Sequence, residues 1–318
     1  MSAGRRILAL HLGVLAALLV LQFALPPYHH TNVARILVLA GYAIGYNVLL
    51  GYTGLMSLGH AMFFAAGMYG AGLPVYYLGV GAPLAFALGL ASGIGLALVF
   101  GLMALRTSGP SFLIVSLMFG QALFLTILYF NDVTLGDQGF ILSAKLAPLE
   151  LGGRPLGFHE PGVKYNAALA IFAACLAAAL ALRLSALGRV LIGIRENEER
   201  TRLLGYDSFR YKLVALGVSG ALASAAGAGY ALLFSYVGAT FASILFSIYP
   251  LLWTLLGGVG TVLGPLLGTA LMFYLVDTVS GVTSSYLLFV GAALVALVLW
   301  FPQGILGTVR SRWLPWLP

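Results

Sequence analysis

Charged residues are scarce in this sequence. Of its 318 residues only 8% are Asp, Glu, Lys or Arg, and 61% are hydrophobic, whereas a soluble domain usually carries about 25% charged residues. So few charges exclude an ordinary soluble domain and predict an all-α integral membrane protein. The net charge of +7 does not indicate a nucleic-acid partner, because excess Lys and Arg in a membrane protein normally mark cytoplasmic loops.

Cysteine and phosphate-binding motifs are also nearly absent. The single cysteine, Cys175, excludes a disulfide within the chain. The sequence has no GxxxxGK[ST] motif, and none of its three lysines follows a glycine-rich loop. The chain therefore cannot hydrolyse ATP with the usual phosphate-binding loop. We assign it no catalytic residue, no metal ligand and no cofactor of its own.

Long apolar runs are present throughout, and we treat residues 1–318 as one membrane domain. At about 20 residues per span, they predict ten transmembrane helices, near 7–25, 33–50, 60–78, 83–105, 110–130, 164–184, 211–236, 243–257, 263–281 and 284–301. Eight spans is the alternative, if two short segments are re-entrant. The run at 7–25 is long for a signal peptide and lacks a small-residue cleavage site, so we expect it to remain as the first helix.

The basic residues predict which loops face the cytoplasm. With ten spans and both termini inside, twelve of the sixteen Lys and Arg residues lie on the cytoplasmic side and four lie outside, as the positive-inside rule requires. This arrangement makes residues 131–163 an external loop. It makes residues 185–210 the only long cytoplasmic loop.

Uncharged polar residues gather around the segment GYTGLMSLGH at 51–60, and a second glycine-rich segment lies at 257–268. Helices broken at mid-membrane free backbone groups that can face a solute. We hypothesise that a solute path is lined by Asn47, Thr53, Ser57, His60 and Gln121, with Gly54, Gly59 and Gly258 allowing close backbone approach. The alternative for each polar residue is a hydrogen bond between helices, worth about 0.6 kcal/mol. We expect His60 to be neutral and bonded to a backbone carbonyl.

Charge within the predicted spans is almost absent. Asp277, near the outer end of the ninth span, is the one acidic residue there. Proton-coupled transporters usually need a buried carboxylate, so this pattern argues against that mechanism.

The sequence IRENEERTRLLGYD at 194–207 predicts a short helix, with acidic residues first, arginines later and Gly205 at its end. Its two leucines have no core of their own, which favours docking of another protein over a merely solvated loop. The predicted contact element comprises Arg195, Glu196, Asn197, Glu198, Glu199, Arg200, Arg202, Leu203, Leu204 and Gly205.

Several segments in order resemble the LivM-type permeases of branched-chain amino-acid ABC importers. They are GYTGLMSLGHAMFFAAGMYGA, SFLIVSLMFGQALF, GRVLIGIRENEERTRLLGYDSFRYKLVALGVSGALASAAGAGYALL, LLGGVGTVLGPLLGTA and FPQGILG. They cover roughly residues 40–307. The sequence departs from the family pattern at TSGPSFL, TLGDQG and residues 145–163, which bears on the solute more than on the fold.

The resemblance implies a permease subunit of an ATP-driven importer in a bacterial or archaeal cytoplasmic membrane. Its expected partners are a LivH-type permease, two ATPase subunits that hold ATP and Mg²⁺, an external solute-binding protein and membrane lipid. Residues 195–205 would contact the ATPase. Branched-chain amino acids are the expected solute, and urea, amides or other amino acids are alternatives. An ion-coupled secondary transporter and a purely structural membrane subunit remain as other classes.

Overall fold

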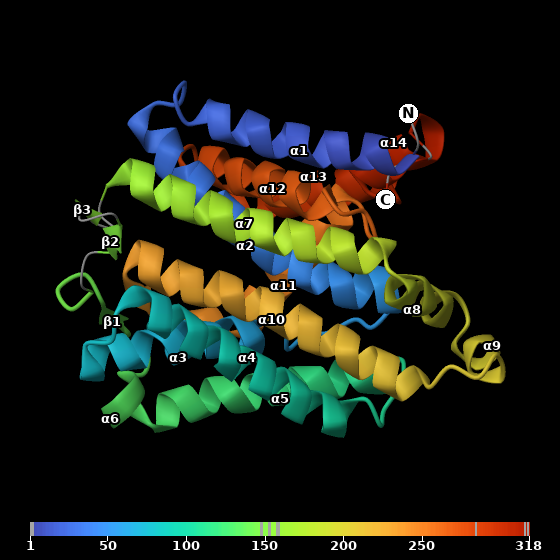
Figure 1. Cartoon of the computed structure of the whole chain (residues 1–318), viewed down its shortest axis with the longest axis horizontal. Coiled ribbons are helices and arrows are strands. Elements are labelled where there is room, and N and C mark those ends of the chain that lie inside the picture. Colours follow the sequence, from blue (N-terminus) through green and yellow to red (C-terminus); the bar gives the residue numbers. More distant parts are fainter. Residues whose placement is uncertain are drawn as a thin grey trace.

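The computed structural model describes residues 3–146, 149–151, 154–156, 160–283, 285–314, 316 and 318. The long helices lie side by side with nearly parallel axes (Figure 1). Both termini lie at the end of the molecule that carries α8 and α9, and α6 and the strands β1–β3 lie at the opposite end. We call these the loop end and the strand end. This placement agrees with an even number of crossings, and the side that faces the cytoplasm stays a prediction.

Ten helices occupy the positions of the predicted spans. They are α1 (Ala3–Leu21), α2 (Pro27–Asn47), α3 (Ala61–Leu78), α4 (Ala82–Ala104), α5 (Pro110–Tyr129), α7 (Pro161–Leu184), α10 (Ser208–Phe234), α11 (Ile244–Gly257), α12 (Gly264–Ser280) and α13 (Tyr286–Trp300). Seven of the described helices are long and apolar enough to cross a membrane, and α11 and α12 are apolar but shorter. A multi-pass helical protein is thereby established, while the count of ten spans stays a prediction.

Several helices begin earlier than the apolar runs suggest, and α2 and α10 show why. α2 starts at Pro27, six residues before the predicted span, because proline is well suited to the first turn of a helix. α10 starts at Ser208, where the side chain of Asp207 accepts hydrogen bonds from the backbone N–H groups of Phe209 and Arg210. Apolar runs mark only the lipid-facing part of a helix, so polar first turns escape them.

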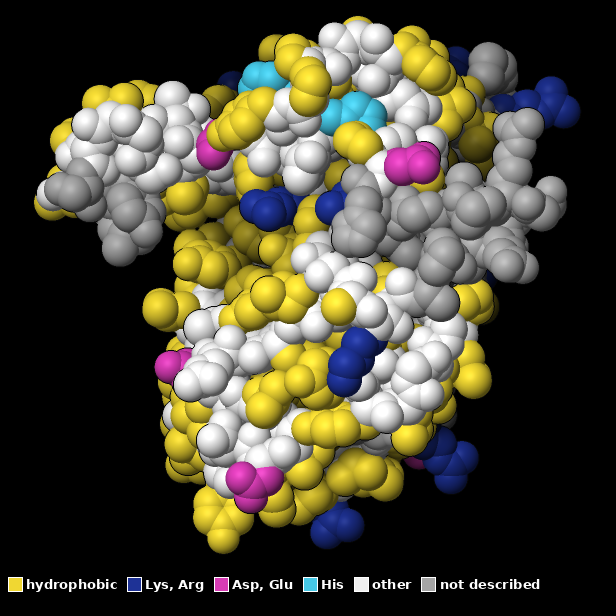
Figure 2. Space-filling model, turned by 90° about the vertical axis from the view of Figure 1, so that its left-hand side faces the viewer, with side chains coloured by type: hydrophobic (Ala, Val, Ile, Leu, Met, Phe, Trp, Pro, Cys, Tyr) yellow, Lys and Arg dark blue, Asp and Glu magenta, His cyan; other side chains and the backbone are white. Residues whose placement is uncertain are grey.

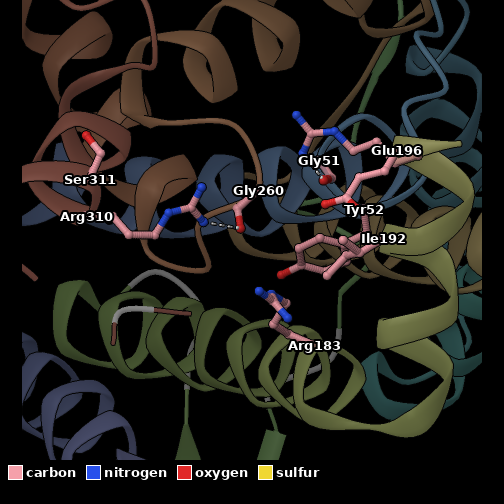
Figure 3. A pocket seen from close by; sticks show the side chains of 9 residues that line it. Gly51, Tyr52, Arg183, Ile192, Glu196, Gly260, Arg310 and Ser311 are labelled. Atoms are coloured by element: carbon pink, nitrogen blue, oxygen red, sulfur yellow. Dashed lines mark hydrogen bonds between the residues drawn. The ribbon is translucent and has the colours of Figure 1, made fainter. Parts of the chain in front are cut away.

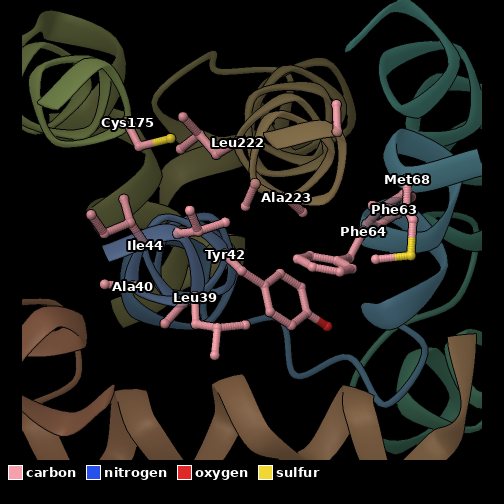
Figure 4. Close-up of a cluster of buried hydrophobic side chains, with 14 of the residues drawn as sticks. Leu39, Ala40, Tyr42, Ile44, Phe63, Phe64, Met68, Cys175, Leu222 and Ala223 are labelled. Carbon is pink, nitrogen blue, oxygen red and sulfur yellow. The ribbon is translucent and has the colours of Figure 1, made fainter. Parts of the chain in front are cut away.

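The centre of the bundle is α2, together with the short π-helix η1 (Val48–Thr53) that continues it. In the 18-residue apolar stretch of α2 and η1, 89% of the residues are buried, whereas 11% are buried in the corresponding stretch of α1. Tyr42 on α2 packs against Phe64 on α3, with ring centroids 4.9 Å apart, and Figure 4 shows α10 and α7 closing the same cluster.

Close helix approach depends on glycine where α3 crosses α10. A Cβ atom added at Gly67 would overlap the backbone of Ser224, and one added at Gly227 would overlap the carbonyl of Phe64. Small residues of this kind let membrane helices pack backbone against backbone.

The strand end holds the main departure from an all-α fold. Here a short helix, α6 (Asn131–Thr134), is followed by β1 (Phe140–Ile141), β2 (Leu149–Leu151) and β3 (Arg154–Leu156). β1 pairs with β4 (Tyr236–Val237), which follows α10, and β2 pairs with β3. Figure 2 shows this end, where acidic and basic side chains are scattered over apolar and uncharged surface.

The remaining elements belong to the loop end and to one short turn. They are α8 (Ala186–Glu196), α9 (Glu198–Leu203), the 3-10 helix η2 (Ala239–Ala242) and α14 (Ile305–Arg312).

Candidate translocation segment and coupling loop

The first candidate region is the broken segment, residues 48–60. α2 and η1 form 27 continuous helical residues, which at about 1.5 Å per residue extend about 40 Å, more than the roughly 30 Å hydrocarbon core. The helix ends at Gly54, with φ 75°, and the depth of this break in the membrane stays a prediction. Residues 54–60 then return into the bundle, where Gly59 packs directly against Ser116 and Gly120 of α5.

Polar side chains from neighbouring helices bind the backbone of the broken segment. Ser116 Oγ accepts from Leu58 N at 3.0 Å, and Ser247 Oγ accepts from Ala61 N at 2.9 Å. Tyr46 donates its hydroxyl to the carbonyl of Ser57 at 3.1 Å. Buried backbone groups that leave a helix need such partners, so these side chains compensate for the break.

Asn47 joins the two glycine-rich segments. Its Nδ2 donates to the carbonyl of Thr261 at 2.9 Å, and its Oδ1 accepts from Gly260 N at 2.8 Å. Gly258 and Gly260 have φ values of 125° and 77°, a region that other residues rarely adopt. Both polar ends of the Asn47 carboxamide are thus used within the chain.

The residues predicted for a solute path do not share one surface. Four are almost fully buried, Asn47, Thr53, Ser57 and His60, with 4% exposure at most. Gly54 is exposed, Gln121 is half-buried, Gly59 lies against α5, and Gly258 packs on Gly304 and Gly307. Exposed Met56 was absent from the sequence-based set, since its apolar side chain gave no signal.

His60 differs from its expected environment. Neither ring nitrogen has a hydrogen-bond partner in the described part of the chain, so the expected bond to a backbone carbonyl is wrong. Its ring lies between those of Tyr42, Tyr46 and Phe63, with centroids 5.0–5.5 Å away. Aromatic packing takes the place of the hydrogen bond.

The second region is the coupling loop, residues 185–210. The short helix predicted over residues 194–207 is divided at Asn197, which is extended at φ −158°. Arg195 and Glu196 therefore end α8. The side chain of Asn197 caps α9 by accepting from Arg200 N at 2.8 Å. Acidic residues do stand in the first turn of α9 and arginines in its last, and Gly205 follows at φ 89°.

Glu198 fastens α9 to α10. It accepts hydrogen bonds from Lys212 Nζ at 2.5 Å and from Arg202 Nη2 at 2.8 Å, and Arg202 Nε also donates to Ser208 Oγ at 2.7 Å. Burial alone would raise the pKa of Glu198, but hydrogen bonds from Lys212 and Ser208 outweigh it and lower the pKa below its ordinary value. Sequence reasoning missed Lys212, although a lone lysine at the start of an apolar span is a usable signal.

Arg195 joins the two regions by a hydrogen bond. Arg195 Nη1 donates to the carbonyl of Gly51, within η1, at 2.5 Å. Gly51 is packed so tightly that an added Cβ would overlap Asn47 and Gly260. The end of α8 is thus joined directly to the broken segment.

The outer face of the coupling loop is apolar at one point. Leu203 is 84% exposed and Leu204 is 72% exposed, and Glu199 and Arg200 beside them are also exposed. Among the residues that the structure describes, no three His, Cys, Asp or Glu side chains gather where they could hold a metal ion.

A bundle of apolar helices with an exposed, anchored loop at one end is the arrangement of a multi-pass helical membrane protein. Residues 30–299 match the family described as branched-chain amino acid transport system permease component. The chain belongs to this family, is not itself an ATPase, and works in a multi-subunit transporter that includes one.

Two curated relatives carry the same name, high-affinity branched-chain amino acid transport system permease protein LivM. The chain is 30% identical to the protein of Salmonella typhimurium over 85% of this chain and 68% of the relative. It is 29% identical to that of Escherichia coli over 94% of this chain and 75% of the relative. No solved structure matches the chain.

Proposed function

We propose that this chain is one of two membrane subunits of an importer that carries branched-chain amino acids inward at the expense of ATP. The family match supports the solute class. The observation that supports ATP coupling is the coupling loop, which exposes two leucines and is anchored to α10 by the ion pair of partly exposed Glu198 with buried Lys212. The partners would be a LivH-type permease, two ATPase subunits and an external solute-binding protein, in a bacterial or archaeal cytoplasmic membrane.

The proposed coupling route has two branches. A push on α9 reaches α10 through Glu198 and Lys212, and α10 packs against α2, α3 and α4. A push on α8 reaches the broken segment through Arg195 and the carbonyl of Gly51. Both branches lead from the ATPase side toward the helices around residues 48–60.

The proposed solute path runs along the interface with the second permease. Gly54 and Gln121 would border it directly, because they reach the surface of this subunit. The buried set, Asn47, Thr53, Ser57 and His60 with Gly59 and Gly258, would shape the wall from behind. This division follows from burial, since a side chain that is at most 4% exposed touches solute only if the bundle opens.

A coupled transport assay tests the proposal. The chain, expressed with its neighbouring genes and reconstituted in vesicles, should take up leucine only with ATP and with the ATPase subunits bound. Uptake on an ion gradient without an ATPase would contradict it and favour a secondary transporter. A thermal-shift screen of the cognate binding protein against amino acids, urea and amides identifies the solute separately.

The leucine pair tests the docking face. Replacing Leu203 and Leu204 by Ser should reduce the ATPase retained on purification at least tenfold, because burying one leucine side chain against a partner contributes about 1.5–3 kcal/mol and a tenfold change in affinity corresponds to about 1.4 kcal/mol. Val133→Ser is the matched control, since Val133 is also exposed but lies at the strand end. Unchanged retention in the double variant would reject this docking face.

Two further residues test coupling rather than docking. Glu199→Gln combined with Gly205→Ala should leave the protein inserted and assembled but lower the uptake obtained per ATP hydrolysed. An unchanged ratio would remove these residues from the coupling element.

A further inference from the structure

Three arginines from separate helices face one cavity at the loop end. Arg183 lies in the last turn of α7, Arg195 ends α8 and Arg310 belongs to α14. The cavity has a volume of about 620 Å³, and Gly51, Tyr52 and Gly260 form part of its wall. Figure 3 shows Arg310 entering it from the left and Arg183 from below.

The positive charge in this arginine cavity is not balanced by the chain. Among the described residues, no ion pair includes Arg183, Arg195 or Arg310. One lining residue, Glu196, is acidic, and it is exposed. Burial lowers the pKa of Arg310, and the charges of Arg183 and Arg195 lower it further. Like charges held this close are costly unless an anion offsets them.

The guanidinium groups also have unused donors. Arg195 gives one N–H to the carbonyl of Gly51, and Arg310 gives one to the carbonyl of Gly260 at 3.4 Å. The Nε atom of Arg183 is buried and has no hydrogen-bond partner in the described part of the chain. Each guanidinium has five N–H donors, so most of them remain available to a ligand.

Arginine donors in this arrangement suit a phosphate group. The planar fork of a guanidinium matches two oxygens of a phosphate or carboxylate, and basic pockets between membrane helices on the cytoplasmic side bind anionic lipid headgroups. A second observation lies next to this cavity: Leu306 and Val309 of α14, with Leu314 just beyond the helix, line a separate, almost wholly apolar cavity of about 540 Å³ with α1, α2 and α12. The same short helix therefore contributes to a basic cavity and to an apolar one that could accept an acyl chain.

We propose that the arginine cavity binds a phosphate-bearing anion, and that the neighbouring apolar groove makes an anionic phospholipid of the same leaflet the main source. The bound phosphate would neutralise Arg183 and Arg310 and hold α14 against the turn at Gly260. It would thereby stabilise the junction of the two glycine-rich segments. The site shares Arg195 and Glu196 with the coupling loop, whereas Arg183 and Arg310 lie outside that loop.

The test uses the full chain purified with the subunits that accompany it. Binding is followed by native mass spectrometry and by thermal shift, with phosphatidylglycerol, diacylglycerol and inorganic phosphate as separate probes. Phosphatidylglycerol should bind and stabilise the wild type, and the double variant R183Q/R310Q should bind it at least tenfold more weakly. R106Q is the control, because Arg106 is exposed at the turn between α4 and α5, outside the cavity.

The outcomes separate the sources of phosphate. Displacement of the lipid by inorganic phosphate supports the site and makes soluble phosphate a second source, whereas no displacement supports lipid alone. If diacylglycerol binds as well as phosphatidylglycerol, or if R183Q/R310Q binds the lipid like the wild type, the proposal is overturned. Should the double variant fail to fold, R310K serves instead. Lysine keeps the positive charge but lacks the planar guanidinium that binds two phosphate oxygens at once. Lipid binding by R310K should therefore fall, while lipid binding by R106Q stays at the wild-type level.

Discussion

The broken segment and the coupling loop both depart from the usual distribution of polar and apolar side chains: the first has polar groups in the interior, and the second has apolar groups on the surface. The broken segment lies in the bundle interior, where Tyr46, Ser116 and Ser247 bind its backbone. The coupling loop carries Leu203 and Leu204 on its surface, and neither packs on the chain's own core. In the broken segment, buried polar side chains supply hydrogen bonds to backbone groups that the helix no longer pairs. In the coupling loop, the exposed leucines form the surface that we propose binds the ATPase.

This comparison makes different predictions for the two regions. Changes in the broken segment should cost stability, since its contacts lie within the chain. Changes on the exposed side of the coupling loop should spare stability and alter assembly. The following variants test that division, in order of expected effect.

Gly59→Leu should cause the largest loss. Any Cβ at residue 59 overlaps the carbonyl of Ser116, and a whole side chain forces α5 away, at a cost of about 3 kcal/mol or more. Thermal denaturation in lipid nanodiscs measures it. Gly95→Leu is the control, since nothing lies within 4 Å of an added Cβ there. Equal melting temperatures for the two variants would show that the segment is loosely packed.

Asn47→Ala should lower the free energy of unfolding by about 2–3 kcal/mol. It leaves Gly260 N and the carbonyl of Thr261 buried without partners, and each unsatisfied group costs about 1–3 kcal/mol. Asn166→Ala removes hydrogen bonds at an exposed site and should cost much less. If Asn47→Ala instead keeps its stability but loses transport, its role is contact with solute.

Glu198→Gln and Glu199→Gln should separate anchoring from docking. Glu198→Gln leaves Lys212 buried without its carboxylate, and we expect a loss of about 1–2 kcal/mol, less than for a fully buried pair because Glu198 is partly exposed. Glu199→Gln should keep the wild-type melting temperature. Similar destabilisation by both variants would contradict the distinction between the two faces of α9.

The smallest expected effect is the pH dependence of the stability that the Glu198–Lys212 ion pair contributes. Since the folded-state pKa of Glu198 lies below its ordinary value of 4.5, the pairing stabilises the fold above pH 4.5 and is lost as pH falls through the lowered pKa. The difference in melting temperature between wild type and Glu198→Gln should therefore be present at pH 7 and shrink on acidification below that value. A constant difference would assign the effect to packing instead.

The elements that could be predicted are those set by local pattern. Apolar runs located the helices, glycines marked both breaks, and the order of charges predicted the short helix that ends before Gly205. The starts of α2 at Pro27 and of α10 at Ser208 could not be predicted in this way, because helix caps and polar first turns lie outside apolar runs. The strand pairing of Phe140 with Val237 also escaped, because two-residue strands leave no periodic signal.

The sequence by itself determined that this chain lies in a membrane, has no phosphate-binding loop for ATP and carries a Leu-Leu pair within a charged loop, since composition and short motifs govern those properties. Only the tertiary structure decided that Asn47 holds Gly260, that Lys212 pairs with Glu198, and that three arginines share one cavity. Asn47 and Gly260 are 213 residues apart, and no local pattern encodes which distant groups meet. Their meeting depends on helix packing, which brings a polar side chain to whichever backbone group the break has left unpaired.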